Sequence, residues 1–127
     1  MPSARAQVAP AVERILEHVE AASLSENQRS DLAIALSEAL ANAAIHGNHL
    51  RADCPVAVCV RVRPGIEAVI EIEDAGPGFD HAHTSDPTAD AHVLRPGGRG
   101  VFLMRHLVDA LEYNGSGNKV RLVVRPH

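Results

Sequence analysis

Aromatic side chains are almost absent from this sequence of 127 residues. Phe79, Phe102 and Tyr113 are the whole set, and tryptophan is missing. A core must therefore be built from leucine, valine, isoleucine and alanine, and a flat ligand would lie between aliphatic walls more than on stacked rings. Cysteine is equally scarce. We expect Cys54 and Cys59 to be reduced structural thiols, with a disulfide or a two-ligand metal site as alternatives.

Two further absences exclude classes of partner. The formal net charge of −4 gives no broad basic surface of the kind that neutralises nucleic-acid phosphates, so we expect no nucleic acid as partner. No apolar run approaches the roughly 18 residues that span a bilayer, and the first residues are not followed by the core of a signal peptide. We therefore expect a cytoplasmic protein with no membrane partner.

The length and composition fit one globular domain that spans residues 1–127, with an ordered core at about 10–125. An apolar fraction of 46% with 22% charged residues is typical of such a domain. A single domain of this size can bury a substantial aliphatic core.

Hydrophobic periodicity predicts helices and strands in a fixed order. A first helix is expected over 8–22, and a second begins after a Ser25 cap, with Gln28 in the capping-box position, and ends at Gly47. The elements predicted after it are strands 56–62 and 68–73 joined by a tight turn, a long loop over 81–96, a helix over 101–110, and strands 111–113 and 119–125. This order predicts an α+β fold, a two-layer sandwich with helices on one face of a mainly antiparallel sheet.

Three polar residues recur at four-residue intervals on the second helix. At roughly 100° per residue, Glu38, Asn42 and His46 form one stripe about 80° wide. Apolar residues flank the stripe on both sides: Leu32, Leu36, Leu40 and Ala43 on one, and Ile34, Ala41 and Ile45 on the other. The stripe is either a solvated face or the polar wall of a ligand cavity. A carboxylate one turn from an amide can accept a proton and offer an oxygen to Mg²⁺.

Two glycine-rich segments offer ligand contacts of other kinds. Asp74 ends a predicted strand and is followed by Gly76 and Gly78. Alone, this pattern is more typical of a turn, but a carboxylate in a pocket also accepts from an exocyclic amine such as that of adenine.

The second segment precedes the third helix. Gly97, Gly98 and Gly100 expose backbone N–H groups at the positive end of a helix, which suits phosphate oxygens, and Arg99 adds a charged donor. A flexible connection into the helix is the alternative interpretation.

Taken together and in order, the three segments resemble the N, G1 and G2 boxes of the GHKL ATPase/kinase superfamily. They are Glu38-x-x-x-Asn42-Ala43-x-x-His46-Gly47-Asn48, Asp74-x-Gly76-x-Gly78-Phe79-Asp80 and Gly97-Gly98-Arg99-Gly100-Val101-Phe102-Leu103-Met104. More narrowly, the sequence is similar to the anti-sigma-factor serine/threonine kinases of bacterial switches, over roughly residues 10–125.

The resemblance implies the Bergerat fold with ATP and Mg²⁺ bound between helices and sheet. It implies that Glu38 is the general base, that Asn42 holds Mg²⁺ and that Asp74 accepts from the adenine amine. Gly76 and Gly78 would shape the adenine pocket. The remaining residues that it assigns to nucleotide binding are His46, Phe79, Gly97, Gly98, Arg99, Gly100, Val101 and Asn118, of which Gly98 and Gly100 would close over the phosphates.

The implied function is a protein serine/threonine kinase that acts in transcription regulation as an anti-sigma factor. It would phosphorylate a STAS-type anti-sigma-factor antagonist and bind a sigma factor, and a homodimer is left open. The alternatives are an ATP-binding regulatory module without catalysis and a detached catalytic domain of a histidine kinase. The sequence departs from the family in two places. Residues 1–9 are too short to supply the usual first strand, and Asn118 stands where the family commonly has threonine.

Overall fold

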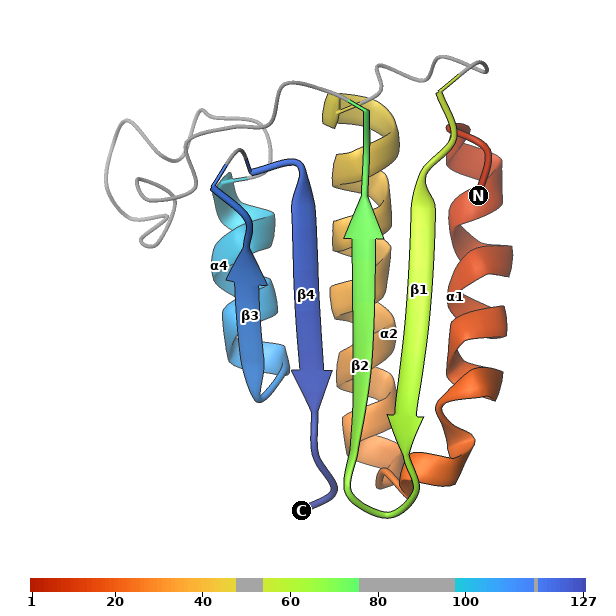
Figure 1. The fold of residues 1–127 in the computed structure, drawn as a ribbon, viewed down its shortest axis with the longest axis vertical. Helices are drawn as coiled ribbons and strands as arrows, with labels where there is room; N and C mark the ends of the chain where they lie inside the picture. The colour runs from red at the N-terminus through yellow and green to blue at the C-terminus, as the bar shows by residue number, and fades with distance from the viewer. Residues whose placement is uncertain (48–53, 76–97, 116) are drawn as a thin grey trace.

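In the described part of the chain, a four-stranded antiparallel sheet and three α-helices form two layers, with the helices on one face of the sheet (Figure 1). The structure is a computed structural model that describes residues 1–47, 54–75, 98–115 and 117–127. The helices are α1 (Val8–His18), α2 (Glu26–Ala41) and α4 (Gly98–Leu107), and the strands are β1 (Ala57–Arg63), β2 (Glu67–Glu73), β3 (Ala110–Tyr113) and β4 (Lys119–Val124). The strand order is β1-β2-β4-β3. The predicted α+β sandwich is therefore confirmed.

The first helix is shorter than predicted. α1 ends at His18, and the predicted last turn is a separate 3₁₀ turn, η2 (Glu20–Ala22). Val19 has left helical geometry at this junction, yet it is completely buried. Periodicity could not reveal the break, because the apolar residues stay on the core side across it.

The start of α2 follows the predicted capping box. The Gln28 N–H donates to the Ser25 hydroxyl at 3.1 Å, and the Ser25 N–H donates back to the Gln28 side-chain oxygen at 3.1 Å. Both N–H groups belong to a helix end, where no partner exists within the helix.

The end of α2 differs from the prediction of one continuous helix. The α-helix stops at Ala41 and continues as a π-helical turn, η3 (Asn42–Gly47). A π turn takes more residues per turn than an α turn, so the 100° spacing fails beyond Ala41. Glu38 and Asn42 keep their one-turn relation, and the extension of the stripe to His46 stays a prediction, because the side chain of His46 lies outside the described residues.

The strands match their predicted positions to within one residue at each end. The positions could be predicted because apolar and polar residues alternate along a strand. In β2, for example, Ala68, Ile70 and Ile72 are all buried toward the helices. β1 and β2 are joined by a tight turn in which Gly65 has a φ of +69°, a left-handed conformation that suits glycine. Every neighbouring pair of strands is antiparallel.

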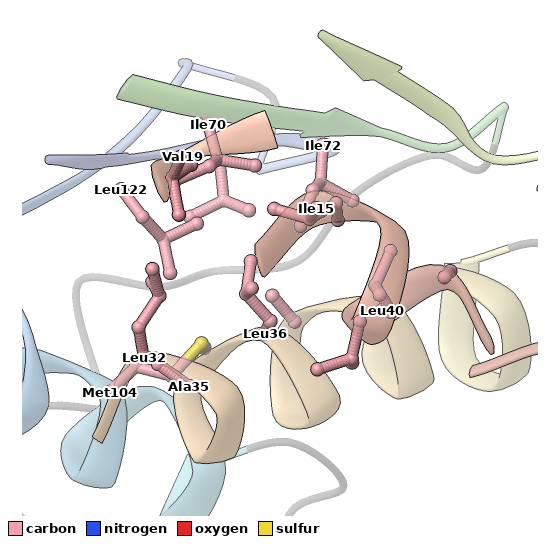
Figure 2. Close-up of a cluster of buried hydrophobic side chains, with 14 of the residues drawn as sticks. Ile15, Val19, Leu32, Ala35, Leu36, Leu40, Ile70, Ile72, Met104 and Leu122 are labelled. Atoms are coloured by element: carbon pink, nitrogen blue, oxygen red, sulfur yellow. The ribbon is translucent and has the colours of Figure 1, made fainter. Parts of the chain in front are cut away.

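The core between the layers is aliphatic, as the composition predicted. In Figure 2, leucines of α2 lie below Ile70 and Ile72 of β2 and Leu122 of β4. Met104 of α4 is completely buried and lies beside Leu32. Within the described residues, no helix is long and apolar enough to cross a membrane.

The N-terminal residues form no strand, in line with the prediction for residues 1–9. Met1 exchanges two backbone hydrogen bonds with Val56, just before β1, and a 3₁₀ turn, η1 (Arg5–Gln7), leads into α1. Cys54 and Cys59 form no disulfide.

Candidate functional site

The described parts of the three predicted segments lie at one end of the two-layer structure. The C-terminal ends of α2 and β2 lie there, together with the first residues of β4 and of α4 (Figure 1). The antiparallel register explains part of this convergence, because Glu73 at the end of β2 pairs with Lys119 at the start of β4. The fold thus brings Glu38, Asn42 and Asp74 to one end from distant parts of the sequence.

Glu38 and Asn42 lie at the boundary between core and surface. Both residues are half-buried. The flank that carries Leu36 and Leu40 is buried as expected, but on the other flank Ile34 is 48% exposed. Apolar residues therefore border the stripe on both sides, but only one of the two flanks is buried in the core.

Asn42 carries a polar atom without a protein partner. Its side-chain Nδ2 is buried and makes no hydrogen bond within the described part of the chain. A buried amide without a partner costs free energy, about 1–3 kcal/mol for a typical group. A buried N–H donor without a protein partner suits an acceptor on a bound group, such as a phosphate or water oxygen, and the oxygen of the same amide is a suitable ligand for a hard cation.

Asp74 is held directly after β2 by Asn118. The Asp74 N–H donates to the backbone oxygen of Asn118 at 2.9 Å, and the Asn118 side-chain Nδ2 donates to the backbone oxygen of Asp74 at 3.2 Å. These bonds join residues that are 44 positions apart in the sequence. The backbone of Asp74 is thus fixed at both its N–H and its carbonyl.

Tyr113 is a neighbour of this site that the sequence interpretation missed. Burial raises the pKa of its hydroxyl well above the ordinary value, the charge of Arg105 opposes the shift and the charge of Asp74 adds to it. The hydroxyl is therefore protonated at neutral pH. The sequence signal was slight: a lone tyrosine at the end of a short strand, followed by an Asn-Gly turn.

α4 begins three residues earlier than predicted. Gly98, Arg99 and Gly100 lie in its first turn instead of in a preceding loop. The first N–H groups of a helix have no partner within the helix and carry its positive end charge, so the position suits an anion. Glycine is unfavourable mainly in the interior of a helix, so Gly98 and Gly100 can lie in the first turn of α4.

Several predicted site residues cannot be placed. Gly76, Gly78, Phe79 and Gly97 lie outside the described residues, as does the predicted loop over 81–96. The side chains of His46, Arg99 and Val101 lie outside the description as well. Their assignment to nucleotide binding stays a prediction.

Comparison with known proteins identifies the type of domain. Residues 1–124 match the family model of the histidine kinase-like ATPase domain. The chain belongs to this family. The histidine kinase-like ATPase domain is of the GHKL type, so the broader part of the predicted resemblance is confirmed. No curated protein sequence matches the chain.

Two solved structures share the fold of this histidine kinase-like ATPase domain. The mycobacterial sensor histidine kinase MprB is 23% identical, with a TM-score of 0.56 over 78% of this chain and 74% of that chain. A histidine kinase domain of the blue-light activated histidine kinase EL346 from Erythrobacter litoralis is 22% identical, with a TM-score of 0.53 over 77% of this chain and 44% of that one. This chain thus spans less than half of the second structure.

ATP-binding domains of this type typically use Mg²⁺, and the described residues fit that ion. The fit rests on the chemistry of Asn42: its amide oxygen would hold the cation, and its buried Nδ2, which has no partner among the described residues, can donate to an oxygen of the bound group. When bound, Mg²⁺ would neutralise negative charge on the phosphates.

Proposed function

We propose that this domain is a protein serine/threonine kinase that acts as an anti-sigma factor. It would transfer the γ-phosphoryl group of ATP to a serine or threonine of a STAS-type anti-sigma-factor antagonist, and it would bind a sigma factor. The observation that carries the proposal is a carboxylate, Glu38, placed one turn before Asn42, whose buried Nδ2 has no partner among the described residues. The choice of partner proteins follows from the sequence resemblance.

The roles of the two residues follow from their chemistry. Glu38 would accept the proton of the substrate hydroxyl while the hydroxyl oxygen bonds to the γ-phosphorus. The bond between that phosphorus and the bridging oxygen breaks, and ADP leaves with the electron pair. Asn42 would hold the cation that accompanies the nucleotide. Asp74, fixed by its bonds to Asn118, would accept a hydrogen bond from the amine of adenine.

A second candidate is an ATP-binding regulatory module that holds a partner without phosphorylating it. One observation favours it: residues 1–7 contain a 3₁₀ turn and no strand, so the element with which related kinases usually begin is not formed by them. Adenine recognition through Asp74 is common to both candidates.

Replacement of Glu38 by alanine separates the two candidates. The assay follows transfer of radiolabel from ATP to a purified STAS-domain antagonist, selected by pull-down with ATP and Mg²⁺. We expect E38A to lower the transfer rate by roughly 10²- to 10⁴-fold, the usual contribution of a general base. ATP affinity should change little, since Glu38 would act on the substrate hydroxyl.

The matched control is E13A, which removes an exposed carboxylate on α1 and should leave the transfer rate unchanged. Transfer that E38A does not slow would reject the role of Glu38. If the wild-type protein binds the antagonist in an ATP-dependent way but yields no phosphoprotein, the regulatory module is the correct function.

A further inference from the structure

The turn between β3 and β4 is organised by one side chain, that of Asn114. Its Oδ1 accepts hydrogen bonds from the N–H groups of Gly117 at 2.8 Å, Asn118 at 3.1 Å and Lys119 at 3.3 Å. An amide oxygen accepts and an amide nitrogen donates, so these bonds fix which end of the side chain faces the turn. The Nδ2 of Asn114 must therefore point away from the turn backbone.

The orientation of Asn114 dictates that of Asn118. The Nδ2 of Asn114 donates to the Oδ1 of Asn118 at 2.7 Å. With its oxygen committed to Asn114, the Asn118 side chain turns its own Nδ2 to the backbone oxygen of Asp74, at 3.2 Å. All three residues are half-buried. A directed chain of hydrogen bonds thus runs from the turn backbone to the residue after β2.

We infer that Asn114 is a positioning residue for Asp74, acting through Asn118, and that it contributes to selectivity for adenine. The inference rests on the proposed role of Asp74 in the nucleotide site. A carboxylate selects an exocyclic amine only if it is held in place. A neighbour that already fixes the residue before binding avoids the entropy cost of ordering it when the nucleotide binds. Asn118 suits this task because its donor and acceptor are separate atoms, so one side chain bridges two groups.

The variant Asn114→Asp tests the inference because it keeps the turn and breaks the chain. A carboxylate at 114 can still accept from the three backbone N–H groups, but it cannot donate to the Oδ1 of Asn118. The Asn118 amide either loses this bond or turns over to donate to the new carboxylate. If the amide turns over, the backbone oxygen of Asp74 loses the Asn118 donor; if it does not, the Asn118 side chain loses the bond that orients it toward Asp74.

The measurement is the affinity for ATP and for inosine triphosphate by isothermal titration calorimetry. Inosine triphosphate carries an oxygen where adenine carries the amine. We expect N114D to weaken ATP binding by roughly five- to tenfold, the effect of one lost hydrogen bond, and to lower the ratio of ATP to inosine triphosphate affinity by a similar factor. The ratio is the decisive readout, because the added negative charge acts on both nucleotides alike.

The control variant N27D makes the same change at an exposed residue in the first turn of α2 and should leave both affinities unchanged. An unchanged ratio in N114D, with or without an equal loss of both affinities, would overturn the positioning role while leaving the proposed function intact. Failure of the wild-type protein to bind ATP would overturn the proposed function, and the inference with it.

Discussion

Glu71 is a buried carboxylate on the face of the sheet that the helices do not cover. Its side chain is only 9% exposed, and it forms salt bridges with Arg61 of β1 and, at 3.1 Å, with Lys119 of β4. Hydrogen bonds from Lys119 and then from Arg61 lower the pKa of this carboxyl below its ordinary value of 4.5, and they outweigh the opposing effect of burial. Because the charged form is favoured in the folded state, Glu71 stabilises the fold above pH 4.5.

The stabilisation from Glu71 should disappear in acid. As the pH falls from 4.5 through the lowered folded-state pKa, the unfolded chain takes up a proton before the folded chain does, so the free energy of unfolding decreases. Urea unfolding of the wild type between pH 5 and pH 3 should therefore show a steeper decrease than that of E71Q.

The control for this experiment is E73Q, an exposed position two residues further along β2. Its pH dependence should follow that of the wild type. Parallel curves for the wild type and E71Q would show that the two cations do not hold the Glu71 charge in the folded protein.

Residue chemistry could be predicted from sequence where it depends on spacing within one element. The one-turn relation of Glu38 and Asn42 is such a case, whereas the π-helical turn after Ala41 changes the spacing that the prediction for His46 assumed. The positions of Tyr113 and Asn114 beside the site depend on contacts between strands and across a turn. No local pattern encodes those contacts.

Among the elements, α2 contacts the C-terminal residues at its start and carries a candidate site residue near its other end. Its start holds the C-terminal residues in place: Gln28 of the capping box also donates from Nε2 to the backbone oxygen of Arg125 at 2.5 Å and accepts from the His127 N–H at 3.3 Å. Its other end carries Glu38 and leads into Asn42. Because an α-helix is rigid, the bonds that fix the start of α2 also fix the position of Glu38 near its other end.

Loss of the Ser25 cap should destabilise the protein measurably. The hydroxyl satisfies one N–H of the first turn of α2, and replacing such a cap by alanine typically costs about 1 kcal/mol. Thermal or urea unfolding of S25A should show this decrease in the free energy of unfolding.

The matched control for the cap is S30A, at an exposed position within the same helix. Alanine is a better helix former than serine, so this variant should be as stable as the wild type or slightly more so. A loss of stability in S30A equal to that in S25A would contradict the capping role.

Element boundaries differ in how far sequence reveals them. The strands were predicted to within one residue because alternation with period two ends where the pairing ends. The end of α1, the π turn after α2 and the start of α4 were not predicted. At the first two, the backbone geometry changes while apolar residues continue on the same side, so hydrophobic periodicity carries no signal of the change. At the start of α4, the first residues are Gly98, Arg99 and Gly100, so the apolar period begins only at Val101.

At the scale of the whole molecule, the two-layer arrangement explains how distant segments form one site. Helix ends and strand ends meet at one end of the sheet, away from the tight turn at Gly65 and the C-terminus (Figure 1). Membership in the histidine kinase-like ATPase domain family agrees with this placement. The aliphatic core fixes the layers against each other, and Glu38, Asn42 and Asp74 lie at their common end.

The most direct test of this account is the affinity of the protein for ATP and GTP with Mg²⁺, measured by calorimetry on the wild type, on D74N and on D31N as a control at the opposite end of α2. We predict that the wild type and D31N prefer ATP, and that D74N loses at least about tenfold of its ATP affinity together with most of that preference, since a hydrogen bond to a charged group is lost. Equal binding of ATP and GTP by the wild type, or an unchanged ATP affinity in D74N, would contradict the assignment of this end of the molecule as an adenine-nucleotide site.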